Sequence, residues 1–147
     1  MGRNRHGKAD RDGVRFLALP HTVMDASAFL KLSAPAVRLL LDIARQYSGT
    51  NNGKLVACSR YLATRGWKSH DTAQRARREL EAAGFIVQTR AGARPNRAAW
   101  FALTWAGLDW IPEMDISKGS FERGLYCKND PLPALPKTRA LSRLAGQ

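Results

Sequence analysis

The sequence predicts an α+β domain in which several helices precede a β-hairpin. Stretches in the first half place apolar residues at helical spacing, with serine, threonine or proline near their starts. The later segments FIVQTR and AAWFALTW are instead rich in β-branched and aromatic residues. A length of 147 residues suits one domain with terminal segments.

Two helices are expected before the first marked turn. In TVMDASAFLKL, Thr22 is the expected N-cap of the first helix. The apolar residues that follow it at helical spacing are Val23, Ala26, Phe29 and Leu30. The second helix is expected to start at Ser33, with Pro35 in its first turn, where the missing N–H costs nothing. Its expected core stripe is Val37, Leu40, Leu41 and Ala44.

A second pair of helices is expected after the turn GTNNGK, which contains the turn dipeptide Asn-Gly. LVAC, residues 55–58, is a short strand candidate directly after this turn. Ser59 is expected to cap a brief helix that stops at Gly66. Ser69 is expected to cap a longer, arginine-rich helix that ends at Gly84.

The hairpin and the terminal segments complete the predicted organisation. FIVQTR and AAWFALTW are expected to pair around the loop AGARPNR, residues 91–97. Residues 1–15 are polar and rich in basic side chains, so they are predicted to be a flexible basic arm. Residues 16–110 are predicted to form the domain. Residues 111–147 contain four of the seven prolines and no sustained periodicity, which predicts a mostly extended tail.

The order helix, helix, short strand, helix, helix, hairpin is typical of a winged helix-turn-helix, in which the second helix of the pair enters the DNA major groove. On a helical wheel of residues 69–84, one side carries Ala73, Ala76, Leu80 and Gly84. The opposite side carries side chains that can hydrogen-bond to base edges. The predicted base-reading residues are Asp71, Gln74, Arg75 and Arg78.

Basic side chains around this helix predict contacts with DNA phosphates. The hairpin segment from residue 88 to residue 104 contains three arginines and no acidic residue. The start of the longer helix favours an anion, because its free N–H groups and the helix dipole attract negative charge. The predicted phosphate-binding residues are Arg60, Lys68, Ser69, His70, Arg90, Arg94 and Arg97.

The composition favours a polyanionic partner, because 24 basic residues face 12 acidic ones and the net charge is +12. Cys58 and Cys127 form no CxxC pair, and the three histidines keep no metal-ligand spacing, so neither a metal nor a cofactor is expected. The sequence contains no recognisable catalytic motif, so an enzyme is not expected. The start MGRNRHGKADRDG is no signal peptide, and no apolar run of about 18 residues occurs, so we expect a cytoplasmic protein without a membrane partner.

The portion from Arg15 to about Asp109 is similar to the winged-helix proteins of proteobacterial plasmids and prophages. The resemblance is carried by FLALPHTVMDASAFLKLSAPAVRLLLDIARQYSGTNNG, YLATRGWKS, RRELEAAGFI and RPNRAAWFALTW. It implies the winged-helix fold and a mobile-element context, and related domains begin plasmid replication initiators. No second winged-helix or catalytic domain, of the kind that initiators carry, is expected in residues 111–147.

The leading functional hypothesis is sequence-specific binding of double-stranded DNA by a transcriptional or replication-control regulator of a mobile element. The alternative is a winged-helix adaptor, or phage-encoded factor, that acts through protein–protein contacts on a host nucleoprotein complex. The arginine-rich helix also fits a solvated surface stabilised by the pairs Arg75–Glu79, Arg77–Glu81 and Arg78–Glu81. A homodimer is compatible with this fold. The segment PLPALP, residues 131–136, is either a docking segment for a protein partner or a linker.

Overall fold

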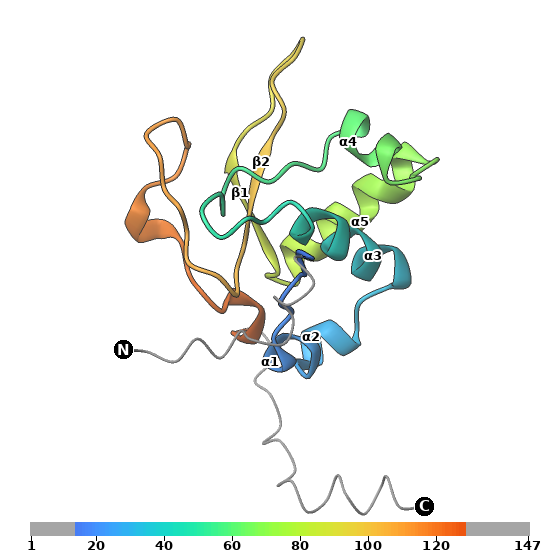
Figure 1. Cartoon of the computed structure of the whole chain (residues 1–147), viewed down its shortest axis with the longest axis vertical. Coiled ribbons are helices and arrows are strands. Elements are labelled where there is room, and N and C mark those ends of the chain that lie inside the picture. The colour runs from blue at the N-terminus through green and yellow to red at the C-terminus, as the bar shows by residue number, and fades with distance from the viewer. Residues whose placement is uncertain (1–13, 129–147) are drawn as a thin grey trace, which may run out of the picture.

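Five α-helices and a two-stranded antiparallel sheet form the regular structure of residues 14–128, the part of the chain that the computed structural model describes (Figure 1). The helices are α1 (His21–Met24), α2 (Ser27–Leu30), α3 (Ala34–Ala44), α4 (Ser59–Thr64) and α5 (His70–Ala82). The strands are β1 (Ile86–Arg90) and β2 (Trp100–Leu103), followed by the 3-10 helices η2 (Lys118–Ser120) and η3 (Leu125–Cys127). The predicted α+β class is confirmed, and the element order is compatible with a winged helix.

The first expected helix is divided into two short ones, so the prediction of a single helix capped by Thr22 is wrong. α1 begins after Pro20, whose carbonyl accepts from the amide of Val23 at 3.0 Å. Ala26 then adopts an extended conformation with φ −63° and ψ 136°, which interrupts the helix and starts α2. Val23 and Ala26 are both buried, so the break follows the burial of these two side chains rather than the helical period.

The start of α3 is as predicted, whereas its buried side is rotated. The Ser33 hydroxyl accepts from the Ala36 amide at 3.3 Å, which confirms the N-cap. Leu41 is 40% exposed and Val37 is only partly buried, so both were wrongly assigned to the core stripe. The buried residues of the helix are Ala36, Leu39, Leu40, Asp42, Ile43 and Ala44.

The segment between α3 and α5 contains less regular structure than predicted. The strand expected at residues 55–58 is reduced to one bridge, in which Leu55 exchanges backbone hydrogen bonds of 3.1 and 2.7 Å with Phe101 of β2. Cys58, not Ser59, occupies the N-cap position of α4, and its side chain makes no cap hydrogen bond. The Ser59 hydroxyl instead lies 3.1 Å from His70, at the start of the next helix.

α5 follows the prediction closely. The Ser69 hydroxyl accepts from the Thr72 amide at 3.2 Å, which confirms the N-cap. The expected inner stripe is buried, and Gly84 takes the left-handed conformation (φ +82°) just after the helix end. α5 packs on α3 through this stripe of small side chains. The buried residues of the helix are Ala73, Ala76 and Leu80.

The predicted hairpin is present and shares its core with the helices. Ile86 pairs with Leu103 and Gln88 with Phe101, and an irregularity between Gln88 and Arg90 increases the local bend of β1. The largest fully buried side chains come from both the helices and the hairpin, and they form one core. They include Phe85, Phe101, Leu39, Leu40 and Ile43.

Asn52, in the turn before α4, fixes the base of the hairpin. Its side chain is fully buried, and its amide nitrogen donates to the carbonyls of Leu103, Ala106 and Gly107 at 3.0, 3.3 and 2.9 Å. Its Oδ1 accepts from the Leu103 amide at 2.7 Å. Gly53 beside it has φ +118°, a conformation that only glycine adopts readily. The Asn-Gly pair therefore makes a turn and also clamps the end of β2.

The chain after Trp110 is not the extended tail that was expected, at least as far as Lys128. Tyr126 is buried and stacks on Phe85 with ring centroids 5.2 Å apart, and burial raises the pKa of its hydroxyl. Asp115 covers the outer edge of β1, where its amide donates to the Thr89 carbonyl at 2.7 Å. The packed unit thus extends beyond the predicted boundary at residue 110, because residues 111–128 bury apolar side chains against it.

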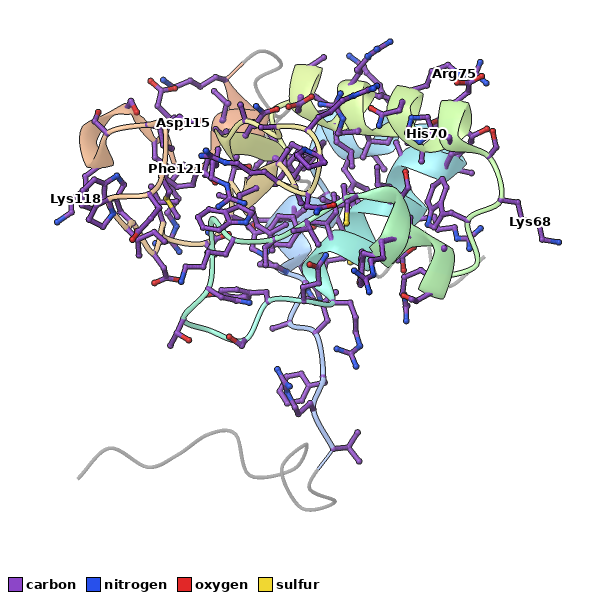
Figure 2. The ribbon with its side chains drawn as sticks, turned by 90° about the horizontal axis from the view of Figure 1, so that it is seen from above. Lys68, His70, Arg75, Asp115, Lys118 and Phe121 are labelled. Carbon is purple, nitrogen blue, oxygen red and sulfur yellow. The ribbon has the colours of Figure 1, made fainter. Side chains whose placement is uncertain are left out.

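The remaining terminal predictions fall mostly outside the described residues. This holds for residues 1–13 of the expected arm and for residues 129–147, which include PLPALP. Val14 and Arg15 are exposed, and the segment that begins with them emerges on the side of the molecule away from α5 (Figure 2). Within residues 14–128 no helix combines the length and apolarity needed to span a bilayer.

Replacing Asn52 by alanine is expected to lower the free energy of unfolding by about 3 kcal/mol, because it leaves buried backbone groups of β2 unpaired. Urea unfolding followed by tryptophan fluorescence measures this change. Lys54→Ala, two residues away at an exposed position, is the matched control and is expected to change stability by no more than about 0.5 kcal/mol. Equal effects of the two substitutions would contradict the clamp.

Candidate nucleic-acid interface

The turn between α4 and α5 is held by the buried carboxylate of Asp42 on α3. Its two oxygens accept from Arg65 Nε at 2.8 Å and from Trp67 Nε1 at 2.7 Å. The Tyr61 hydroxyl donates to the Asp42 carbonyl, and burial raises the pKa of this hydroxyl. Since these donors come from α4 and from the turn after it, they determine where α5 begins relative to α3.

Glu79 links the C-terminal half of α5 to the start of α3. Its carboxylate accepts from the Ser33 amide at 2.8 Å and from the Ser33 hydroxyl at 2.6 Å, at the start of α3. The expected Arg75–Glu79 pair therefore does not form, and neither does Arg78–Glu81, whereas Arg77–Glu81 is present at 2.7 Å. Arg75 and Arg78 are exposed and have no ion pair within the described part of the chain.

The outward side of α5 carries three of the four predicted base-reading residues. Asp71, Arg75 and Arg78 are all exposed there. In Figure 2, Arg75 and His70 lie along the α5 edge of the molecule, and Lys68 projects from the turn just before the helix. Gln74 differs from the prediction, because it is partly buried and its Oε1 accepts from Arg77 Nε at 3.0 Å. It belongs to the side of α5 that faces the hairpin.

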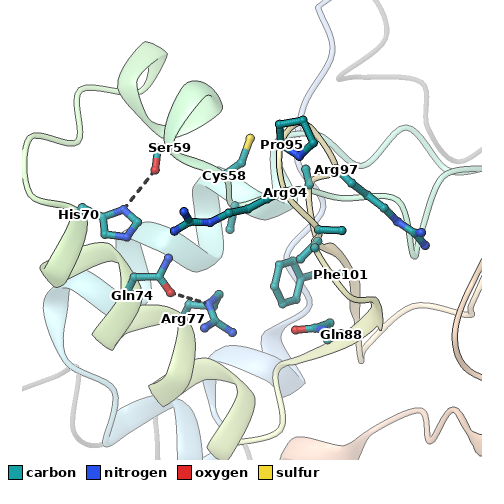
Figure 3. A pocket seen from close by; sticks show the side chains of 15 residues that line it. Cys58, Ser59, His70, Gln74, Arg77, Gln88, Arg94, Pro95, Arg97 and Phe101 are labelled. Atoms are coloured by element: carbon teal, nitrogen blue, oxygen red, sulfur yellow. Dashed lines mark hydrogen bonds between the residues drawn. The ribbon is translucent and has the colours of Figure 1, made fainter.

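A groove with a volume of about 520 Å³ separates this side of α5 from the hairpin loop (Figure 3). Residues of the α4 start, α5, both strands and the loop line it. No carboxylate occurs among its lining residues, so its electrostatic character is positive. Its charged or ionisable lining residues besides the Cys58 thiol are His70, Arg77, Arg94 and Arg97.

The two arginines of the hairpin loop point in different directions. Arg94 extends from the loop across the groove toward His70 and Gln74, whereas Arg97 extends to the other side of the loop (Figure 3). Both are exposed and have no ion pair within residues 14–128. His70 faces Arg94 from α5, and its Nδ1 lies 3.1 Å from the Ser59 hydroxyl. The hairpin loop and the starts of α4 and α5 therefore surround the same groove.

Unlike Arg94 and Arg97, Arg90 is held within the hairpin, which argues against its predicted contact with a phosphate. Its guanidinium carbon lies 3.4 Å from the ring centroid of Trp100, and its Nη2 donates to the Ala98 carbonyl at 2.9 Å. Burial lowers the pKa of this guanidinium, and the nearby charge of Arg97 lowers it further. Arg90 therefore braces the two strands against each other.

The other predicted phosphate contacts have different surroundings. Arg60 and Lys68 are exposed, whereas the Ser69 hydroxyl is occupied by the helix cap. Ser59 and Gln88 line the groove but were not among the predicted site residues. No spacing signal identifies them, because Ser59 meets His70 across eleven residues and Gln88 enters the groove only through the pairing of β1 with β2.

The fold and the groove define an α+β protein with a basic, carboxylate-free groove beside an exposed arginine-bearing helix. Comparison of the chain with family models, curated proteins and solved structures finds no match to any of them. Among residues 14–128, no group of three or more histidine, cysteine or carboxylate side chains has the arrangement of a metal site. Cys58 and Cys127 carry free thiols.

Arg90→Gln is expected to lower the free energy of unfolding by about 1 kcal/mol, because it removes the stacking on Trp100 and weakens the link to Ala98. Arg97→Gln removes the same charge from the same hairpin at an exposed position, and it is expected to leave stability within about 0.5 kcal/mol. Parallel chemical unfolding of the two variants measures the difference. If Arg97→Gln were the more destabilising change, the bracing role of Arg90 would be wrong.

Proposed function

We propose that the protein is a winged helix-turn-helix protein that binds double-stranded DNA sequence-specifically, as a transcriptional or replication-control regulator of a mobile element. The observation that carries this proposal is the adjacency of unpaired Arg75 and Arg78 on α5 to a basic groove closed by Arg94. The topology supports it, because α4 and α5 form the helix pair and the Leu55–Phe101 bridge adds a third short partner to the hairpin. Its place of action would be the cytoplasm.

In this proposal α5 enters the major groove and reads base edges. Arg75 and Arg78 can each donate two hydrogen bonds to guanine O6 and N7, and Asp71 can accept from cytosine N4. Gln74 plays a smaller part than first expected, because its Oε1 is occupied by Arg77. Ala82 lies on the same side near the helix end and leaves the backbone of α5 free to approach a base pair closely.

Exposed cations on both sides of α5 would contact the phosphates that border the major groove. Lys68 and Arg60 lie on the helix-pair side, and Arg94 and Arg97 lie on the hairpin loop. Such contacts release condensed counterions, so binding weakens steeply as salt rises. They fix the position of the protein on the duplex but distinguish no sequence.

A second candidate function is the adaptor that acts through protein contacts. It draws on a shallow, largely apolar depression on the outer side of α3. The depression is lined by Ala34, Val37 and Leu41 together with Arg38, Asp42 and Arg65. Leu41 is 40% exposed there, as a docking contact would require. DNA binding is the preferred proposal, because the carboxylate-free groove with its converging cations has no counterpart in an apolar docking surface.

A fluorescence-anisotropy titration of random-sequence duplex DNA, at about 50 mM and about 200 mM salt, tests the proposal. Selection of bound duplexes from a random pool then supplies a preferred site as competitor. Steep salt dependence together with preferential competition is the expected result. Salt-dependent binding without any preference would leave a non-specific DNA binder, and no binding at the lower salt would favour the adaptor.

Arg75→Ala and Arg78→Ala are each expected to weaken binding to the preferred site by about 1–3 kcal/mol and to relax base preference. Arg97→Ala is expected to weaken preferred and random duplexes by the same factor and to reduce the salt dependence. Anisotropy titrations of both duplexes with each variant measure these effects. If the helix and loop variants changed both duplexes alike, the division between base reading and phosphate contact would be wrong.

A further inference from the structure

We propose that the groove between α5 and the hairpin loop holds one backbone phosphate of the bound DNA, and that His70 contacts this phosphate as an imidazolium beside Arg94. Binding of DNA would then take up a proton. The inference rests on the proposed DNA-binding function and goes further, because it assigns the two elements to one shared phosphate. It also makes the affinity depend on pH.

The placement of the two cations supports a shared ligand. Arg94 reaches across the groove toward His70, from the loop on one wall to the helix on the other (Figure 3). Neither side chain has a carboxylate partner within the described residues. An imidazolium at His70 would be repelled by Arg94 in the free protein, and a phosphate between the two groups would offset this repulsion.

We assign proton uptake to His70 and not to the other charged or ionisable groups around it. Arg77 is held by Glu81 at 2.7 Å and by Gln74 at 3.0 Å, so its charge is largely compensated. Arg97 extends to the far side of the loop (Figure 3). Other ionisable neighbours are the Cys58 thiol at the groove wall, the exposed Lys68 before α5, and Asp71, which follows His70 in the chain but lies on the outward side of α5 and not in the groove. Histidine is the residue type whose charge most often changes near neutral pH, so His70 is the group in this groove that we assign to proton uptake.

The contact between His70 and Ser59 orients the ring for this task. Nδ1 lies 3.1 Å from the Ser59 hydroxyl, and a hydroxyl can either donate or accept. The contact therefore persists in the neutral imidazole and in the imidazolium, where Nδ1–H donates to Ser59. In the charged form the second nitrogen, Nε2, also carries a proton, which it can donate to a phosphate oxygen.

The direction of the pH dependence follows from these protonation states. A phosphate favours the imidazolium, so the bound state holds its proton to higher pH than the free state does. The extra affinity is present at low pH and disappears as the pH rises above the ordinary histidine range. If the pKa of a histidine is one unit higher in the DNA-bound state than in the free state, affinity increases by roughly fivefold from about pH 8 to about pH 6.

The test is an anisotropy titration of the full chain with one duplex, at constant ionic strength, from about pH 6 to about pH 8. The wild type is expected to show the fivefold increase in affinity toward low pH. His70→Gln is expected to bind with the weaker, high-pH affinity throughout, and His70→Lys to bind tightly without pH dependence. His21→Gln, at an exposed position on α1, is the matched control and is expected to retain the dependence.

Two results would overturn the inference while leaving DNA binding intact. One is wild-type binding that is tight but independent of pH, and the other is a pH dependence that survives in His70→Gln. Arg94→Gln adds a second readout, because loss of the facing cation is expected to weaken binding and to reduce the pH dependence. Failure of the proposed function would look different, since no variant would then bind duplex DNA at either pH.

Discussion

The arrangement of the candidate interface depends on the buried carboxylate of Asp42. A charge removed from water is unfavourable by several kcal/mol unless it is paired and hydrogen-bonded. Asp42 meets this requirement only when Arg65 and Trp67 reach it together, from the turn between α4 and α5. The turn therefore has little freedom, and the start of α5 is held where His70 meets Ser59. The hydrogen bonds of Asp42 thus fix the position of α5 relative to α3 and α4, and with it the surface that α5 presents.

The exposed basic character of the molecule results as much from the placement of its acids as from its arginines. Glu79 is occupied by Ser33, Asp42 by the α4–α5 turn, and Glu81 by Arg77. Each of these three acids satisfies a structural donor, so none of them pairs with the outward Arg75 or Arg78. The i,i+4 rule alone places Glu79 beside Arg75, but a backbone amide and a hydroxyl at a helix start are better-organised partners than a flexible exposed side chain.

The parts of the fold that could be predicted from the sequence are those that short-range interactions and local composition determine. The caps at Ser33 and Ser69 and the glycine after α5 were recognisable, because each depends on residues within a few positions of one another. The paired β-rich segments were recognisable from their own composition and the loop between them. The broken first helix was not, since burial of Val23 and Ala26 overrode the helical period. The packing of Tyr126 on Phe85 and the convergence of Arg94 with His70 are long-range contacts that no pattern along the chain records.

The rigidity of the hairpin explains why the groove can be formed before any ligand arrives. Asn52 clamps the end of β2, Arg90 stacks on Trp100 between the strands, and the segment around Asp115 covers the outer edge of β1. A loop carried by such a hairpin loses little conformational entropy when its arginines meet an anion, so more of the interaction appears as affinity. In the proposed function, the same bracing would limit the movement of the loop beside α5, and a groove with limited movement would hold a phosphate better than a mobile loop would.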